Sequence, residues 1–285
     1  MTAETVRCDT CPRGCVLHEG ENGACGVRGC RNGAVIPLNY GRLTSVAIDP
    51  VEKKPLARFR PGSRILSVGS YGCNMACPFC QNHEISKAET APDGSAWEDA
   101  AESCTPEQLC DLAVDYARRA GNIGVAYTYN EPLTGWEFVR DTSRLVREAG
   151  LVNVIVTNGC VNAHVWRELL PVTDAVNIDL KCYTEEGYRR LGGDLDTVKE
   201  SIRLCARHCH TEITSLIVPG LNDDEAQMEE EAAFLASVSP EIVLHVTRYF
   251  PRYRMTAGEP TPIAVIERLT EAAGRYLEDV LPGNV

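Results

Sequence analysis

The sequence predicts an α/β protein built on a parallel sheet. From about Arg64 onward, short apolar or β-branched runs alternate with segments of helical periodicity. The runs are nearly continuous in apolar residues, which is typical of strands covered on both faces. Six of them qualify as strands, at residues 65–68, 123–127, 154–157, 175–179, 213–218 and 242–246. The alternation fits either a barrel or an open doubly wound sheet.

The segments between these runs carry the start and stop signals of helices. The clearest start is Thr105, followed by Pro106 and, three positions after Thr105, by Gln108. This is a capping box ahead of an apolar stripe that continues to Ala120. Further helices are expected at residues 136–149, 163–170, 195–208, 224–237 and 262–277. The polar segment 84–104 has no regular period, so we expect a surface loop there.

Charge and composition exclude several classes of protein. The 285 residues carry a net charge of −12, whereas a binder of phosphate backbones needs a basic surface, so nucleic acid is not an expected partner. No stretch approaches the roughly 18 apolar residues of a membrane span, and the N-terminus lacks a signal-peptide profile. We therefore expect a cytoplasmic protein with no membrane partner. In that compartment metal ligation or reactive thiols explain the 14 cysteines better than disulfides do.

The first 60 residues differ from the rest of the chain. They carry nine Lys and Arg against six Asp and Glu, and residues 1–35 have almost no periodic apolar pattern. Four cysteines in this segment lie within eighteen residues: Cys8, Cys11, Cys15 and Cys25. Metal binding there can supply the missing folding energy. We expect a metal-binding module with its connecting segment at residues 1–60 and a second domain at residues 61–285.

The sharpest motif follows the first expected strand. Cys73, Cys77 and Cys80 are spaced C-x3-C-x2-C, with Gly72 before the first cysteine and Phe79 before the last. Three thiolates can bind three irons of one cuboidal [4Fe–4S] cluster and leave the fourth iron without a protein ligand. An open coordination position is a catalytic feature. The alternative is a zinc site completed by a distant His or Cys, although zinc ligand pairs normally show C-x2–4-C twice.

At these residues the sequence resembles the radical S-adenosylmethionine (radical SAM) superfamily, whose defining motif is this cysteine triad. The resemblance covers nearly the whole chain and is strongest to the enzymes of the AmmeMemoRadiSam system, which are related to the pyruvate formate-lyase activating enzymes. It rests on the segments Asp49–Leu56, Cys80–Asn82, Tyr127–Pro132, Thr157–Gly159, Asp179–Lys181, Val218–Asp223 and Gly283–Val285. It implies a partial (βα)6 barrel of the TIM type for the second domain, ending in a C-terminal helix, and the six expected strands agree.

The motifs fall at or near the carboxyl ends of the expected strands, where a barrel builds its site. The resemblance implies contacts to S-adenosylmethionine (SAM) from Asp179 and Lys181 and from a histidine late in the barrel, which His245 matches. Chemically, the methionyl amine needs an acceptor such as Glu131 or Asp179, and the carboxylate needs a cation such as Lys181. The full set of expected cofactor contacts is Phe79, Asn130, Glu131, Asn158, Asp179, Lys181 and His245.

Each of these residues also has a structural interpretation. Asp179 and Lys181 can form a solvated ion pair on the barrel rim. His245 is flanked by Leu244 and Val246 and can be a hydrogen-bonded core histidine. Asn130 and Asn158 can cap turns.

The resemblance also implies the activity. A [4Fe–4S] cluster, reduced by ferredoxin or flavodoxin, would cleave SAM to a 5′-deoxyadenosyl radical that abstracts hydrogen, so we expect an oxygen-sensitive oxidoreductase. One hypothesis is action on an undefined substrate with companion proteins of the AmmeMemoRadiSam system. A second is activation of a glycyl radical enzyme, and a third is a noncatalytic Fe–S electron carrier or metal-binding module, which has no need of an open iron.

The four N-terminal cysteines would form a closed site. An auxiliary [4Fe–4S] cluster that relays electrons fits four protein ligands, and so does a structural zinc. We favour the cluster because the protein is already expected to load one. Cys160, directly after the third expected strand, is a candidate catalytic thiol.

Overall fold

The computed structural model describes residues 5–87 and 94–285 and centres on an eight-stranded sheet. Its order is β14-β13-β12-β11-β10-β9-β7-β6, and every neighbouring pair except β6 and β7 is parallel. The six expected strands correspond to β7 (Arg64–Gly69), β9 (Asn122–Tyr127), β10 (Val152–Thr157), β11 (Ala175–Asp179), β12 (His210–Ile217) and β13 (Val243–Arg248). The prediction of a parallel sheet is confirmed.

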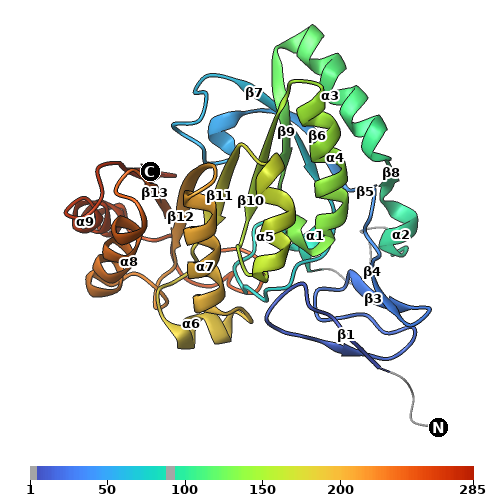
Figure 1. The fold of residues 1–285 in the computed structure, drawn as a ribbon. Helices are drawn as coiled ribbons and strands as arrows, with labels where there is room; N and C mark the ends of the chain where they lie inside the picture. The colour runs from blue at the N-terminus through green and yellow to red at the C-terminus, as the bar shows by residue number, and fades with distance from the viewer. Residues whose placement is uncertain (1–4, 88–93) are drawn as a thin grey trace.

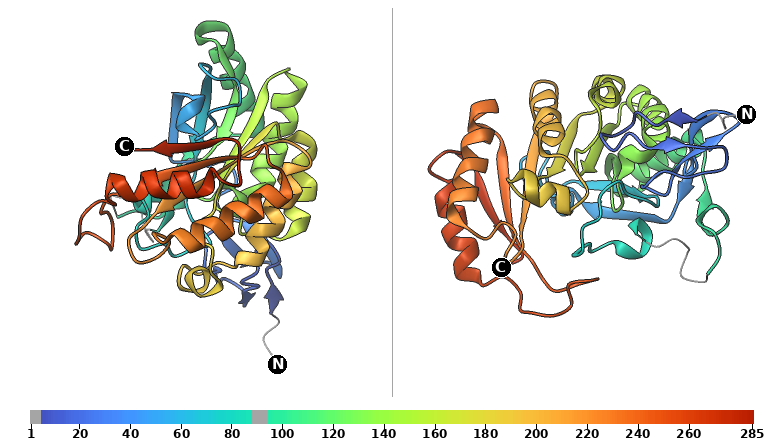
Figure 2. Two further views of the ribbon diagram at one scale, coloured as in Figure 1. Left: turned by 90° about the vertical axis from the view of Figure 1, so that its left-hand side faces the viewer. Right: turned by 90° about the horizontal axis from the view of Figure 1, so that it is seen from below.

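The sheet has two free edges. β14 (Val280–Gly283) continues it in parallel beyond β13, and β6 (Ser45–Pro50) pairs antiparallel with β7 at the other end. Within the described chain β14 and β6 do not pair with each other, so the curved sheet forms a partial barrel, as expected (Figure 2). β6 belongs to this sheet although it lies within the first 60 residues.

Helices cover the outer side of the sheet (Figures 1 and 2). The six expected helices are present as α3 (Pro106–Ala120), α4 (Trp136–Glu148), α5 (Ala163–Leu169), α7 (Leu195–Ala206), α8 (Glu225–Val238) and α9 (Ile263–Ala273). The predicted capping box of α3 forms, since Gln108 N donates to Thr105 Oγ1 at 3.2 Å and Thr105 N donates to Gln108 Oε1 at 2.8 Å. No helix in the described part of the chain is long and apolar enough to cross a membrane.

Several short elements were not expected. They are the helix α6 (Glu185–Arg190) and the 3-10 turns η1 (Val51–Lys53), η2 (Pro132–Gly135) and η3 (Leu170–Val172). The expected loop at 84–104 is partly wrong, because it includes most of α1 (His83–Ser86), together with α2 (Trp97–Ala100) and β8 (Glu102–Ser103). Residues 88–93 of that segment lie outside the described chain. These elements are too short to show a period in the sequence.

The N-terminal segment folds into small hairpins that lie below the sheet in Figure 1. β1 (Val6–Arg7) pairs with β2 (Val16–Leu17), and β3 (Arg28–Arg31) pairs with β4 (Ala34–Pro37). β5 (Arg42–Leu43) then pairs with β8. We call residues 5–37 the N-terminal hairpins below.

The N-terminal hairpins bind directly to the loop that follows β7. The backbone N–H of Cys73 donates to the carbonyl of Cys25 at 3.2 Å. Gly72 has a φ of 84°, and a β-carbon there would lie 2.5 Å from a methyl group of Val27, so the close approach needs glycine. Buried Arg28 also forms an ion pair with Glu137 of α4 at 2.7 Å. The cysteine loop therefore has the hairpins as one of its walls.

Candidate active site

A cavity of about 410 Å³ opens at the carboxyl ends of the parallel strands. The cysteine triad lines it together with all but one of the expected cofactor contacts. These residues are Cys73, Cys77, Phe79, Cys80, Asn130, Glu131, Asn158, Asp179 and Lys181. They follow or end β7, β9, β10 and β11, so the parallel topology brings together residues far apart in the sequence.

Burial raises the pKa of two thiols of the triad, Cys73 and Cys77. Burial raises the pKa of Cys77 to about 12, Lys181 opposes this shift, and the neighbouring Cys73 and Cys80 thiols add to it. Cys73 Sγ accepts from the N–H of Met75 at 3.4 Å, and hydrogen bonds to ligand sulfurs tune the potential of an iron–sulfur cluster. Metal binding at Cys73 and Cys77 therefore has to displace their protons.

The described residues do not form a preformed site for a single metal ion, since no three His, Cys, Asp or Glu side chains meet closely enough. Ligands of a cuboidal cluster bind separate irons, so they need not meet at one point. The triad lines a cavity with an adjoining acid and lysine, and this donor set fits an open [4Fe–4S] cluster with an amino acid group beside it.

Glu131 is a buried carboxyl group on the cavity wall. It is 2% exposed and accepts from Thr157 Oγ1 at 2.7 Å, from Asn158 N at 2.7 Å and from Leu133 N at 3.0 Å. Burial raises its pKa to about 7, although these three donors favour the charged form. An ammonium group in the cavity would offset that cost and keep Glu131 ionised.

Asn158 connects this carboxyl group to the cysteine loop. Its side-chain amide donates to Asn74 Oδ1 at 2.9 Å and lies 3.7 Å from Cys73 Sγ. Asn74 in turn donates to the carbonyl of Cys160 at 2.7 Å. Asn158 therefore contacts Glu131 through its backbone and the cysteine loop through its side chain, so it does more than cap a turn.

Asn130 also lines the cavity, but its side-chain bonds hold backbone. Its amide donates to the carbonyls of Tyr71 and Gly72 at 3.0 and 3.2 Å, and its Oδ1 accepts from Ser70 N at 3.0 Å. These contacts agree with the turn-capping interpretation. Asn130 shapes the loop that carries the triad.

Asp179 and Lys181 form an ion pair of 2.8 Å at the cavity. Burial alone would lower the pKa of Lys181, but Asp179 together with Cys77 and Cys80 outweighs it and raises that pKa. Asn222, from the segment Val218–Asp223, donates to the carbonyl of Lys181 at 3.3 Å. The pair presents one anion and one cation to the cavity, the charges that complement an amino acid zwitterion.

His245 is not among the residues that line the cavity. It lies on β13 two residues before Thr247, which does line it, so the alternation of a strand places His245 on the same face one step deeper. Its Nε2 is 2.6 Å from Oε2 of Glu212, a fully buried carboxylate that also accepts from the N–H of Arg58. These contacts match the core-histidine interpretation, and this position does not support the predicted contact to SAM.

Several residues at the cavity had no role assigned from the sequence. Lys54 is buried, pairs with Asp49 Oδ2 at 2.8 Å and lies 4.6 Å from the ring centre of Tyr129. Tyr129 also donates to the same carboxylate at 2.8 Å. In the sequence, these residues could have been found only because they lie in two segments of the resemblance, Asp49–Leu56 and Tyr127–Pro132. Thr128, Thr214, Thr247 and Asn284 also line the cavity.

The four N-terminal cysteines also gather in space. Cys8 N donates to the carbonyl of Cys15 at 2.9 Å. Burial raises the pKa of Cys11, and the nearby Cys8 and Cys15 thiols raise it further. Burial likewise raises the pKa of Cys25, with Cys11 and Cys8 contributing in the same direction. These mutual effects show that the four thiols lie near one another.

Cys160 is 2% exposed, and burial raises its pKa to about 12. A thiol with a raised pKa stays protonated at neutral pH and is a weak nucleophile. These properties do not support the predicted catalytic role.

Comparison with known proteins identifies the family. Residues 67–232 match the sequence profile of the Radical SAM superfamily. An uncharacterized protein of Methanocaldococcus jannaschii is 37% identical over 283 residues, which are 98% of this chain and 81% of that protein. The chain belongs to the radical SAM superfamily, and it is an enzyme that uses a [4Fe–4S] cluster and SAM.

More distant relatives have named activities. The pyruvate formate-lyase 1-activating enzyme of Escherichia coli is 30% identical over 172 residues, 58% of this chain and 65% of that enzyme. The pyruvate formate-lyase-activating enzyme of Clostridium pasteurianum is 27% identical over 191 residues. The chain is thus homologous to the activating enzymes over a little more than half its length.

Solved structures agree on the fold. Streptococcus suis SuiB bound to S-adenosylmethionine aligns with a TM-score of 0.58 at 15% identity, over 78% of this chain and 52% of that one. A radical SAM methyltransferase from Sphaerobacter thermophilus aligns with a TM-score of 0.55 at 15% identity, over 79% of this chain and 67% of that one. At such identities the likeness concerns the fold alone.

If Glu131 accepts from the methionyl amine, as expected from the sequence, Glu131→Gln should weaken SAM binding by about tenfold or more. A neutral amide would lack the charge-assisted hydrogen bond. The matched control is Glu231→Gln, which changes another buried carboxyl group, one that does not line the cavity. Equilibrium binding of SAM to anaerobically reconstituted protein measures both variants. Unchanged affinity in Glu131→Gln, or equal loss in both, would contradict the role of Glu131.

Proposed function

We propose that this radical SAM enzyme belongs to the AmmeMemoRadiSam system and abstracts hydrogen from a substrate together with companion proteins of that system. The observation that carries the proposal is the cavity in which three cysteine thiols face a buried carboxyl group and an Asp–Lys pair. Cluster and SAM, when bound, would supply the electron and the carbon radical. The chain itself supplies ligands, orientation and exclusion of water.

Each residue has a proposed task in holding SAM. Cys73, Cys77 and Cys80 would bind three irons, and Asp179 and Glu131 would accept hydrogen bonds from the methionyl amine. Lys181 would pair with the methionyl carboxylate. Phe79 is 3% exposed and would provide an apolar wall beside the cysteines.

The assignment to the AmmeMemoRadiSam system is supported by where its segments lie. Asp49–Leu56, Tyr127–Pro132 and Gly283–Val285 each contribute side chains to the cavity. Lys53 and Lys54 come from the first and Asn284 from the last, so both free edges of the sheet contribute. Segments that carry the resemblance are thus placed where a substrate would be selected.

The second candidate is a glycyl radical enzyme activase, in which the hydrogen donor is a backbone glycine of a large partner protein. Homology to the pyruvate formate-lyase activating enzymes favours it. The side chain of Asn222 in the Val218–Asp223 segment donates to the carbonyl of Lys181 in the Asp179–Lys181 segment, so these two segments of the resemblance meet at one site. The cysteine triad lines a cavity that could hold a ligand of the open iron. A noncatalytic electron carrier has no need of such a site, so this third hypothesis is disfavoured.

For the N-terminal hairpins we propose an auxiliary [4Fe–4S] cluster bound by Cys8, Cys11, Cys15 and Cys25. The direct hydrogen bond from Cys73 N to the Cys25 carbonyl supports an electron relay, because it joins the two cysteine sets through one short backbone contact. We further propose that residues 1–60 form the metal module with its connecting segment, although β6 at their end belongs to the sheet of the barrel domain.

We expect Cys77→Ala to abolish the reductive cleavage of SAM to 5′-deoxyadenosine, because the cluster loses one of three ligands. Cys110→Ala, which alters a buried thiol on α3 outside both sets, should retain the activity. Chromatography of 5′-deoxyadenosine after anaerobic photoreduction measures the rate. Cleavage by Cys77→Ala at the wild-type rate would show that the triad is wrongly assigned.

Anaerobically reconstituted protein should contain about eight irons per chain if both cysteine sets hold [4Fe–4S] clusters. Cys11→Ala should lower this to about four and leave the signal of the triad cluster in electron paramagnetic resonance (EPR) spectra. Metal analysis decides the outcome. About four irons with one zinc in the wild-type protein would refute the auxiliary cluster but not the enzyme activity.

Isotope transfer distinguishes the two candidate substrates. On our proposal, 5′-deoxyadenosine formed in the presence of a glycyl radical enzyme labelled with deuterated glycine contains no deuterium. Mass spectrometry of the recovered 5′-deoxyadenosine tests this, with pyruvate formate-lyase and its own activating enzyme as the positive control. Deuterium carried over from glycine by this chain would overturn the first candidate and establish the activase.

A further inference from the structure

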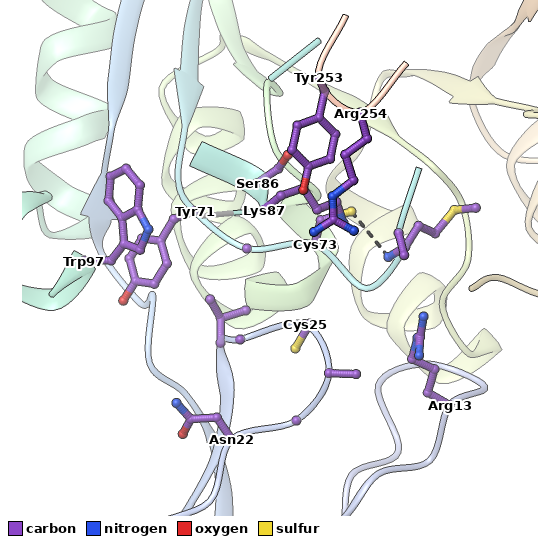
Figure 3. A pocket seen from close by; sticks show the side chains of 17 residues that line it. Arg13, Asn22, Cys25, Tyr71, Cys73, Ser86, Lys87, Trp97, Tyr253 and Arg254 are labelled. Carbon is purple, nitrogen blue, oxygen red and sulfur yellow. Dashed lines mark hydrogen bonds between the residues drawn. The ribbon is translucent and has the colours of Figure 1, made fainter. Parts of the chain in front are cut away.

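A second cavity, of about 450 Å³, is shown in Figure 3. It lies next to the cavity of about 410 Å³ that the cysteine triad lines, which we call the catalytic cavity. The walls of the second cavity come from the N-terminal hairpins, from the loop after β7, from α1 with Lys87, from α2 and from the chain near Tyr253. No strand of the parallel sheet contributes. It shares Cys73, Met75, Ser86 and Lys87 with the catalytic cavity. We call it the outer cavity. It therefore reaches the cysteine loop from outside the barrel.

The outer cavity is positively charged. Arg13, Lys87 and Arg254 line it, and no Asp or Glu does among the described residues. None of the ion pairs formed by the described residues involves these three cations. Arg13 Nε donates to the backbone carbonyl of Asn74 at 2.8 Å, which leaves its charge uncompensated. In a chain with a net charge of −12 this is a local concentration of positive charge.

Both cysteine sets border the outer cavity. Cys25 and Cys73 both line it (Figure 3). Their backbones are joined by the 3.2 Å hydrogen bond. A molecule seated at the mouth would therefore be close to the ligands of either metal centre.

We propose that the mouth of the outer cavity is the docking site for an acidic, one-electron carrier protein that reduces the enzyme. This inference rests on the proposed function. In each transfer the carrier is oxidised by one electron and an enzyme cluster is reduced from the 2+ to the 1+ state, with no proton transferred. SAM and substrate would occupy the catalytic cavity, so the donor has to approach from outside the barrel.

The exposure of the cations favours a protein over a small anion. Arg13 and Arg254 are exposed at the rim and Lys87 is half-buried. A small-ligand site buries its ligand and places polar groups around it, whereas charges on a rim steer an oppositely charged protein and speed its association. Charge complementarity with these cations requires a carrier whose docking face is acidic.

The test measures reduction by flavodoxin hydroquinone in an anaerobic stopped-flow instrument, at about 50 mM and about 500 mM salt. For the wild type we expect the second-order rate constant to fall by about tenfold or more at the higher salt. Arg254→Glu, and more strongly Arg13→Glu/Arg254→Glu, should lower the low-salt rate constant by about tenfold and reduce its salt dependence. Replacing Arg13 also removes its hydrogen bond to the backbone of Asn74, so the single variant Arg254→Glu tests the charge without that structural change.

The matched control is Arg118→Glu/Arg119→Glu at the end of α3, which makes the same charge change at exposed positions that do not line the outer cavity. It should keep the wild-type rate constant within about twofold, since distant surface charges are screened. All variants should keep the wild-type iron content, SAM affinity and cluster EPR signal after photoreduction with deazaflavin.

Three outcomes would overturn the inference. They are an unchanged flavodoxin rate constant in the double variant, an equal loss in the Arg118/Arg119 control, and inhibition of the wild type by phosphate at constant ionic strength, which would mark a small-anion site. Failure of the proposed function looks different, because photoreduced wild-type protein would then give no cluster signal or no 5′-deoxyadenosine.

Discussion

The loops of the site are held together by the hydrogen bonds that the buried carboxyl group of Glu131 accepts. It accepts hydrogen bonds from Thr157 and Asn158, so it ties the end of β9 to the end of β10. Asn158 then extends the connection to Asn74 in the cysteine loop after β7. Burying a carboxyl group in this way costs free energy, which hydrogen bonds to the charged form and an incoming cation reduce. The geometry of three loops therefore depends on one group whose charge state depends on the ligand.

The cysteine loop after β7 is held on two sides by the rest of the chain. Asn130 holds the backbone from Ser70 to Gly72, and the N-terminal hairpins close its outer side through Cys25 and Val27. The loop is thus positioned by polar contacts on its barrel side and by packing on its outer side. A loop held in this way keeps its shape without a fourth ligand from the chain.

Much of this fold could be predicted from the sequence because its elements are local. Apolar runs identified the six strands, and Thr105 with Gln108 marked a helix start that the structure confirms. Contacts between distant segments could not be found in this way. His245 lies 2.6 Å from Glu212, which is 33 residues away in the sequence. The residues next to His245 do not reveal whether its ring contacts such a distant side chain or a cofactor. The hydrogen bond from Cys73 N to the Cys25 carbonyl likewise depends on tertiary packing and could not be predicted from the local sequence.

The two free edges of the sheet have a mechanical consequence. Both edges contribute to the catalytic cavity, Lys53 and Lys54 after β6 and Asn284 after β14. In the described chain no ladder of backbone hydrogen bonds joins these two strands. The gap between them can therefore widen without breaking any strand pairing, unlike the wall of a closed barrel.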